Sequence, residues 1–497
     1  MNENVRKNID ILLGDPKRAI IKLSIPMMIG NLIQTLYTIV DGIWVSGIGA
    51  NSLAAVGIFM PFMMILSALA MGIGVGGSSA ISRAIGRKDR KRAGNIAEHT
   101  LVAGVIIGTL SGYIMIPVLE RIFLAMGISP SVASMAYEYG SIILLASPFI
   151  FIFNLGSAIL RGEGDTKRAM YLMAGSAIMN TVLDPVFIYY LKLGVNGAAI
   201  ATVTSIVSAS LVIMYWLLIK KDTYVQLRLR YFRRDIGIIV EILKVGIPSS
   251  LAQISMSLTM IVLNTIVIMA GGDYGMAVFS GGWRIVMIAI VPLMGMAASV
   301  TSVTGAAFGA MDIEKLRTGY LYAVKIGTVT GMITGFLIGV FAPQLTYLFT
   351  YSRGSAYLAP GIITFLRYVV FYFPAVAAGM LTSSMFRGIG LGSHSLALTV
   401  VRAFGMQIIF TYMLGIVFDM GLSGIWTGIV VANILASVVA IIWGTRTINR
   451  IEALHRDGTN IAVVSSEYNP IENPGEFLPH GNHRQEEPDK DQKSTRN

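Results

Sequence analysis

The chain has 497 residues, of which 54% are hydrophobic and 13% are charged, and its formal net charge is +11. In an ordinary soluble domain about a quarter of the residues are charged. This composition therefore excludes an ordinary soluble domain. The mean hydropathy of +0.69 comes from long apolar stretches, and a helix needs about 20 apolar residues to cross a bilayer. The sequence contains no cysteine, which excludes disulfides and thiolate metal sites.

The chain begins with a polar segment, 1–14, whose apolar residues recur at helical spacing. This pattern predicts a helix on the cytoplasmic membrane surface and not a cleavable leader. The first membrane span begins at Asp15 and Pro16, because Asp is a suitable N-cap and Pro a suitable first helical residue. Six spans are predicted in the first half, 15–219, near 15–44, 52–82, 94–119, 131–159, 167–191 and 195–219.

The second half, 236–450, contains six more predicted spans, near 236–270, 274–308, 315–345, 355–385, 393–417 and 422–445. A basic connector, 220–235, joins the two halves, and we expect it to be a cytoplasmic strap lying on anionic lipid headgroups. The last segment, 451–497, is polar and shows no periodicity, so we expect it to be a disordered cytoplasmic tail.

The placement of basic residues predicts the orientation of the spans. Lys and Arg cluster in the 83–92 loop, around 161–168 and in the connector, whereas the loops 46–52 and 271–275 contain none. Because basic loops stay in the cytoplasm, we expect both termini to be cytoplasmic and the protein to reside in the cell membrane. The same placement accounts for the net positive charge without any nucleic-acid binding.

Internal repetition is the strongest organisational signal in the sequence. Landmarks recur in the same order at a nearly constant offset: 24–26 with 246–248, 72–89 with 295–312, 161–164 with 387–390, and 194–197 with 421–424. Each half therefore contributes six helices that begin on the same side of the membrane, which is a parallel repeat. The predicted fold is all-α, with two pseudo-symmetric six-helix bundles around a central cleft that opens to alternate sides as the bundles rock.

Two aspartates lie within predicted spans, where a carboxylate is costly and therefore usually functional. Asp41 shares a helix face with Tyr37, and Asp184 lies one turn after Asn180. Pro185 follows Asp184, and because proline lacks an N–H it frees a carbonyl one turn earlier. Such oxygen-rich, partly unwound sites suit Na⁺ or a proton. The structural alternative is that Asp41 lies in water at the outer end of its helix and that Asp184 ends its own helix.

The second half lacks equivalent acids, because the repeat aligns Asp41 with Leu263 or Asn264 and Asp184 with Thr411. We therefore expect the coupling chemistry in the first half alone. The basic residues inside the second-half spans are Arg284, Lys325, Arg367 and Arg402. We expect the first two to form a polar cluster, and the others to snorkel or to hydrogen-bond between helices.

Three segments occur in a characteristic order within the repeat: GDPKRAIIKLSIPMMIGNLIQTLYTIVDGIWV, ILRGEGDTKRAM and NTVLDPVFIY. Over roughly residues 10–450 the chain resembles the multidrug and toxic compound extrusion (MATE) family, and within it the DinF-like archaeal and bacterial branch. The resemblance implies a secondary active exporter that antiports small amphipathic or cationic organic compounds against H⁺ or Na⁺, with no other cofactor. It implies a helix bend at Pro26 during transport. It also implies a cation site formed by Tyr37, Asp41, Asn180, Asp184 and Thr202.

Polar and methionine side chains are the candidates for lining the substrate cleft, since methionine repacks around varied shapes. These candidates are Gln34, Tyr139, Asn154, Ser157, Met173, Ser176 and Met256. One chain forms the whole cleft, so we expect a monomer that contacts membrane lipids.

Three other functions remain open as alternatives. A flippase of lipid-linked precursors in the same superfamily is the first. An enzyme is the second, but the sequence contains no HExxH, nucleophile elbow or P-loop. A channel is the third, although functional acids in only one half of a duplicated bundle favour a transporter.

Overall fold

The computed structural model describes residues 3–220, 222–227, 232, 234–351 and 354–456, and these residues contain helices but no β-strand. Met1–Asn449 form one compact unit, and Arg450–Asn497 form a second one. The predicted disordered tail, 451–497, lies outside the described residues from 457 onward, whereas 451–456 continue the last helix.

The first half of the chain, here called the N-lobe, begins with a short helix and continues with long apolar ones. They are α1 (Glu3–Leu13), α2 (Pro16–Ser46), α3 (Ala50–Gly86), α4 (Arg90–Ala125), α5 (Pro130–Leu145), α6 (Ser147–Gly162), α7 (Thr166–Pro185), η1 (Val186–Tyr190), α8 (Gly194–Met214) and η2 (Tyr215–Lys220). The predicted cap is confirmed, since the Asp15 side chain accepts a hydrogen bond from the Lys17 N–H at 3.2 Å. The span predicted at 131–159 is bent by 52° between α5 and α6, where Pro148 cannot donate to the preceding turn.

The second half, here called the C-lobe, repeats this arrangement with more breaks. Its elements are α9 (Ile236–Ala289), α10 (Val291–Gly309), α11 (Ile313–Val340), α12 (Ala342–Thr350), η4 (Ala356–Leu358), α13 (Ala359–Tyr368), η5 (Val369–Phe371), α14 (Tyr372–Gly388), α15 (Gly392–Val400), η6 (Val401–Ile408), α16 (Ile409–Tyr412), η7 (Met413–Val417) and α17 (Gly421–Arg456). Gly272, with φ 55° and ψ −150°, breaks α9 into two arms at the predicted loop. Among the described residues eleven helices are long and apolar enough to span a membrane, and the bent α5–α6 pair makes a twelfth span.

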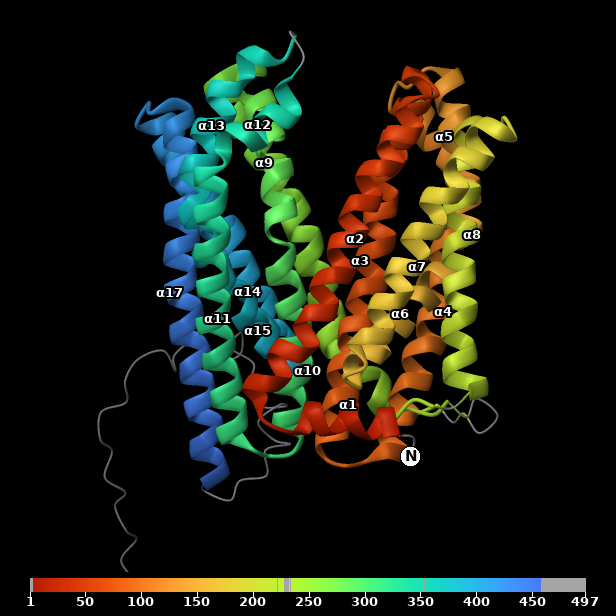
Figure 1. Ribbon diagram of the computed structural model, residues 1–497, viewed down its shortest axis with the longest axis vertical. Helices are drawn as coiled ribbons and strands as arrows, with labels where there is room; N and C mark the ends of the chain where they lie inside the picture. The colour runs from red at the N-terminus through yellow and green to blue at the C-terminus, as the bar shows by residue number, and fades with distance from the viewer. Residues whose placement is uncertain (1–2, 221, 228–231, 233, 352–353, 457–497) are drawn as a thin grey trace, which may run out of the picture. The chain divides into compact units, whose positions relative to one another are not determined.

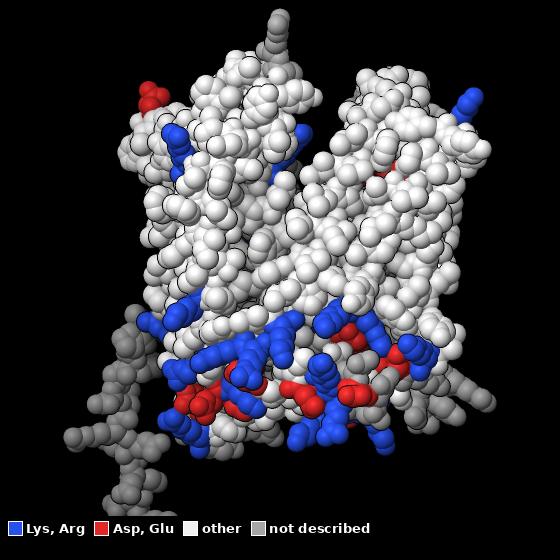
Figure 2. Space-filling view, in the orientation of Figure 1, with Lys and Arg blue, Asp and Glu red and all other residues white. Residues whose placement is uncertain are grey.

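The two lobes meet at one end of the molecule and separate toward the other. They touch through α2 and α3 of the N-lobe and α9 and α10 of the C-lobe, and Figure 1 shows the two groups of helices diverging away from α1. Figure 2 shows a notch between the lobes at the end opposite α1, and charged side chains gathered at the end where the lobes meet. Exposed cations on the loops of this basic end include Arg87, Lys88, Arg90, Lys91 and Lys167.

Close backbone packing holds the lobes together near the basic end. Gly76 of α3 lies directly against the Ile242 carbonyl of α9, and the Gly246 N–H is 3.1 Å from the point where a Cβ on Gly76 would sit. On the same helix, Gly57 has no atom within 4 Å of that point. Lipid tails provide no hydrophobic drive between helices in a membrane, so helix association depends on close van der Waals packing. Small residues permit that close approach.

The connector folds back onto the N-lobe where it is described. Thr223, Val225 and Leu227 are buried, and Arg168 donates to both carboxylate oxygens of Asp222 at 2.9 and 2.8 Å. The prediction that the connector lies on lipid headgroups is therefore wrong for these residues, because burial of apolar side chains and a bidentate ion pair hold them against protein.

Glu163, in the turn between α6 and α7, lies beneath this connector. Its side chain is 2% exposed and accepts a hydrogen bond from the Val225 N–H at 3.0 Å. Burial raises the pKa of Glu163 to about 8, and the Val225 hydrogen bond and the nearby Arg168 oppose this rise only in part. The acid is therefore held mostly in its neutral form near pH 7.

We expect Gly76→Ala to destabilise the protein and Gly57→Ala not to. Both changes remove a helical glycine and so gain about 1 kcal/mol of helix propensity. At position 76 the new methyl group would collide with the Ile242 carbonyl, and overpacking of this kind costs about 1–3 kcal/mol. Thermal unfolding of the purified variants in detergent measures the difference. Equal melting temperatures for the two variants would contradict the close contact.

We expect Glu163→Gln to make stability less sensitive to pH. The folded-state pKa of Glu163, about 8, lies above the unfolded value of about 4.3. The stabilisation is therefore complete below the unfolded pKa, is lost progressively as the pH rises toward the folded pKa, and stays lost above it. Between pH of about 5 and pH of about 9, the unfolding temperature should fall less for Glu163→Gln than for wild type. Glu120→Gln, which changes an exposed carboxylate, should behave as wild type.

Candidate functional site

Asp41 and Asp184 face each other inside the N-lobe. Asp41 is half-buried on α2, and Asp184, at the end of α7, has no exposed surface. Helices α2 and α7 pack together, and the two carboxyl groups lie close enough to share a hydrogen bond. Such a bond needs a proton on one of the two groups, since two bare carboxylates at this distance repel. The pair is therefore stable only with a proton or another cation between its oxygens.

Asn180 connects this pair to α8. With its amide nitrogen turned toward Asp184 it donates to Oδ2 at 2.8 Å, and its oxygen accepts from the Thr202 N–H at 3.0 Å and from Thr202 Oγ1 at 3.2 Å. The opposite orientation would place the amide oxygen against the carboxylate, so the hydrogen-bond network selects this one. Asn180 is 1% exposed, so its orientation is fixed by these partners.

Two tyrosines complete the surroundings of the carboxyl pair. The Tyr37 hydroxyl hydrogen-bonds the Thr202 side chain, and both carboxyl groups are close enough to Tyr37 to act on it electrostatically. Tyr139 of α5 is likewise within electrostatic reach of Asp41 and Asp184. All five residues predicted for the cation site thus lie together, on α2, α7 and α8.

Local backbone geometry places the two acids. Pro185 ends α7 directly after Asp184, and the chain continues as a wide π-helical turn, η1, a form that is frequent at functional sites. The Tyr189 hydroxyl of this turn donates to the Trp44 carbonyl of α2 at 2.7 Å, and their rings are 6.1 Å apart. The end of α2 that carries Asp41 is thereby tied to the segment that follows Asp184.

The donor set fits a small hard cation. It offers two carboxyl groups and two hydroxyl oxygens, while the Asn180 amide oxygen is engaged by Thr202, and hard cations such as Na⁺ prefer oxygen ligands on partly unwound helices. Among the described residues no group of three or more His, Cys, Asp or Glu side chains could hold a metal ion. The site therefore combines two acids with neutral hydroxyl oxygens.

The predicted cleft residues divide by exposure. The partly exposed ones are Gln34, Asn154, Met173, Ser176 and Met256. Tyr139 and Ser157 are buried, at 8% and 3% exposure, so their side chains do not face open space. Pro26 is also buried, inside the continuous helix α2.

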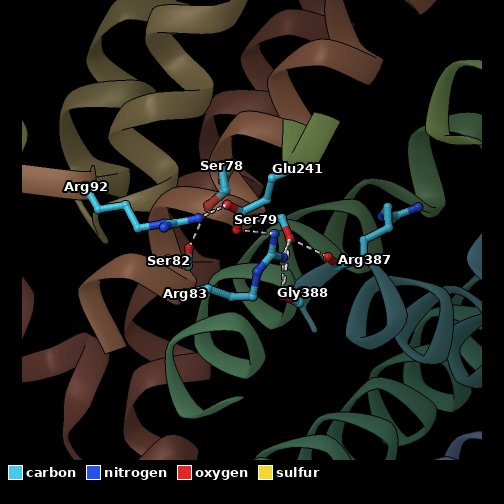
Figure 3. Close-up of polar contacts among 8 residues, drawn as sticks. All are labelled: Ser78, Ser79, Ser82, Arg83, Arg92, Glu241, Arg387 and Gly388. Carbon is cyan, nitrogen blue, oxygen red and sulfur yellow. Dashed lines mark hydrogen bonds and ion pairs between the residues drawn. The ribbon is translucent and has the colours of Figure 1, made fainter. Parts of the chain in front are cut away.

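An ion-pair network closes the lobes at the basic end (Figure 3). Arg83 of α3, 5% exposed, donates to Glu241 Oε1 of α9 at 3.1 Å and to the Gly388 carbonyl of α14 at 3.1 Å. Arg92 of α4 donates to the other oxygen of Glu241 at 2.8 Å. One C-lobe carboxylate thus holds two N-lobe arginines.

Hydroxyl groups add main-chain contacts between the lobes. Ser79 of α3 donates to the Arg387 carbonyl of α14, and Ser302 of α10 donates to the Arg161 carbonyl of α6 at 2.9 Å. Sequence analysis missed this closure because Arg83 and Glu241 are 158 residues apart, and no pattern pairs them. The available signal was that Glu241 is an acid near the start of an apolar span, whereas Arg83 belongs to the basic cluster of the 83–92 loop.

Comparison with known proteins agrees with this architecture. The MatE family model matches residues 26–186 and 248–413. The multidrug export protein MepA of Staphylococcus saprophyticus is 26% identical over 428 residues, which cover 86% of this chain and 92% of that protein.

Two solved structures are closer in sequence. One is the outward-facing conformation of a multidrug resistance MATE family transporter of the MOP superfamily, with 48% identity, a TM-score of 0.87, and coverage of 90% of this chain and 99% of that one. The other is a MOP superfamily transporter from Pyrococcus furiosus, described by the reverse polarity of its binding pocket and a different function, with the same identity, TM-score and coverage. The chain therefore belongs to the MATE family of multidrug efflux transporters, which are multi-pass membrane transporters and not enzymes.

Proposed function

We propose that this protein exports small amphipathic organic compounds, including organic cations, in exchange for H⁺ or Na⁺. The observation that carries the proposal is the close pair of Asp41 and Asp184 beside the oxygens of Asn180 and Thr202. An acid pair in a membrane interior needs a cation to be stable, so loading and unloading that cation changes the energy of the N-lobe. The multidrug export names of the relatives support an organic substrate.

The coupling step follows from this pair. A cation that enters through the notch neutralises the acids and rearranges the hydrogen bond between Asp184 and Asn180. Helix α2 carries Asp41 and also Pro26, and because proline supplies no N–H, the turn before it is the weakest point of α2. A bend at Pro26 moves Asp41 toward α7, shrinks the N-lobe cavity and expels the substrate.

The basic end faces the cytoplasm in this proposal, since basic loops stay on that side. The notch then faces outward, and the network of Arg83, Arg92 and Glu241 is the closed inner gate. Alternating access requires this network to open and the outer ends of the lobes to approach each other.

We expect Asp41→Asn and Asp184→Asn each to abolish gradient-driven efflux. Each change keeps the shape of the side chain but removes the charge that binds the coupling cation. The measurement is the movement of a cationic fluorescent dye in proteoliposomes under an imposed pH or Na⁺ gradient. Glu120→Gln, an exposed N-lobe carboxylate, is the matched control and should transport as wild type. Undiminished efflux in both Asp variants would sink the coupling role of the pair.

We expect Glu241→Gln to open the inner gate. Removing one partner of a buried ion pair costs about 3–5 kcal/mol because the other charge is left uncompensated, so the closed state loses its advantage. Since the chain has no cysteine, a single Ser302→Cys placed in the lobe contact reports opening through its reaction with a maleimide. Labelling should become faster by at least about tenfold when Glu241→Gln is added.

Glu314→Gln changes an exposed carboxylate on α11 and should leave the labelling rate of Ser302→Cys unchanged. Equal labelling rates with and without Glu241→Gln would show that the network does not hold the lobes closed.

A further inference from the structure

The membrane-spanning parts of the two lobes carry opposite charges. In the N-lobe no Lys or Arg occurs between Lys22 and Arg83 or between Arg168 and Lys192, the stretches that contain Asp41 and Asp184. In the C-lobe no Asp or Glu occurs between Glu314 and Asp419, whereas that stretch contains Lys325, Arg367 and Arg402. Divergence of a duplicated bundle has thus given the two lobes opposite polarity.

Arg402, like Lys325 and Arg367, lies well inside its span. It lies about ten residues, or roughly 15 Å, into the span Gly392–Val417, which is about half the thickness of the hydrocarbon core. Its side chain points into the lobe, because its Cδ is the nearest atom to Gly379 of α14. Among the described residues no carboxylate forms a salt bridge with it, and a charge at this depth marks a substrate or ion path.

The polar groups around Arg402 are arranged to donate. Arg402 Nη1 donates to Asn433 Oδ1 of α17 at 3.3 Å, and Asn433 Nδ2 in turn lies 3.5 Å from Gln407 Oε1. The hydrogen bond to Asn433 occupies one of the five guanidinium N–H groups of Arg402. The Tyr372 phenol is within electrostatic reach of the guanidinium.

An aromatic wall adjoins these donors. The Tyr372 and Trp283 ring centroids are 6.0 Å apart, and those of Trp283 and Phe279 are 5.3 Å apart. Trp283 is half-exposed on α9, and α9 borders the notch between the lobes (Figures 1 and 2). The half-exposed Trp283 ring offers a stacking face to a flat aromatic molecule, and the adjacent Tyr372 ring lies within electrostatic reach of the Arg402 guanidinium.

Equivalent helices of the two lobes carry the two polar sites. Asn180 and Thr202 of the N-lobe site lie on α7 and α8, and by the repeat these helices correspond to Gly392–Val417 and α17, which carry Arg402 and Asn433. The Arg402 segment is π-helical, like η1 after Asp184, and this wide turn distinguishes it from ordinary lipid-facing helix.

We propose that Arg402, supported by Asn433 and Gln407, is a C-lobe site for the carboxylate of an aromatic, amphipathic substrate. The proposal rests on the export function above and narrows its substrate class to compounds that carry an anionic group, with or without a cationic one. The N-lobe acids then bind the coupling cation while the C-lobe guanidinium holds the substrate, so the two do not compete for one site.

The test is equilibrium binding without any ion gradient, which separates this site from coupling. Purified full-length protein in uncharged detergent is titrated against a rhodamine with a free carboxyl group and against its methyl ester, with fluorescence anisotropy as the readout. Wild type should bind the free acid more tightly than the ester by on the order of tenfold, the value of one charge-assisted hydrogen-bond pair. Arg402→Gln should remove this preference by weakening the binding of the free acid alone. Arg402→Lys should retain part of the preference.

Two controls complete the design. Arg446→Gln, an exposed arginine on α17, should keep the full preference. Asp184→Asn should also keep the preference for the free acid, even where gradient-driven transport is lost. Failure of the coupling proposal can therefore be distinguished from failure of the Arg402 proposal. Thermal unfolding of the Arg402 variants confirms that they are folded.

Three results would overturn the proposal. The first is equal affinity of wild type for acid and ester, and the second is an equal loss for both dyes in Arg402→Gln. The third is displacement of the free acid by phosphatidylglycerol but not by phosphatidylcholine, with Arg402→Gln abolishing the effect. That result would assign the site to a lipid headgroup and not to a soluble carboxylate.

Discussion

Two carboxyl groups buried side by side in a lipid-embedded bundle impose the constraint around which the N-lobe is built. Asp184 is fully buried and Asp41 is half-buried, so water screens their mutual repulsion only in part, and a proton or a cation shared between them would relieve it. The chain supplies the remaining oxygens from neighbouring helices, through Asn180 and Thr202, and fixes both acids by tying the end of α2 to the turn after α7. The state of this pair therefore acts on two helices at once, which is what a coupling site needs.

The coupling role that we propose for this pair requires its energy to reach the opposite end of the molecule. The contact between the lobes is concentrated at the basic end, where Gly76 allows α3 to touch the backbone of α9 and Glu241 joins Arg83 to Arg92. Small residues give a flat surface without interlocking side chains, and ion pairs can exchange partners for water when they open. Such an interface is strong when closed and still separable, whereas a tightly interdigitated apolar interface would resist rocking.

The duplicated lobes have the same helical plan but have taken different chemical roles. The stretches around Asp41 and Asp184 contain no Lys or Arg, and the C-lobe stretch between Glu314 and Asp419 contains no Asp or Glu. In our proposal this difference in charge orients a substrate that has both polar and aromatic parts. Flexible methionines, such as the exposed Met256, allow the same walls to fit molecules of different shape.

The sequence by itself determined the membrane spans, the repeat and the two acids inside apolar spans, Asp41 and Asp184, whereas Thr202 entered the predicted site only through the family resemblance. Hydropathy and proline or glycine breaks act locally along the chain, and an acid inside an apolar span is visible without any knowledge of packing. Only the tertiary structure showed that Tyr139 and Ser157 are buried, that the connector turns inward at Val225, and that Arg83 meets Glu241. Burial and pairing depend on which helix faces which, and helices with near-uniform apolar surfaces in lipid carry no periodic signal of their partner. The expectation that Arg402 bonds between helices is confirmed by its hydrogen bond to Asn433 of α17. The identity of that partner became visible only once α17 and η6 were placed together.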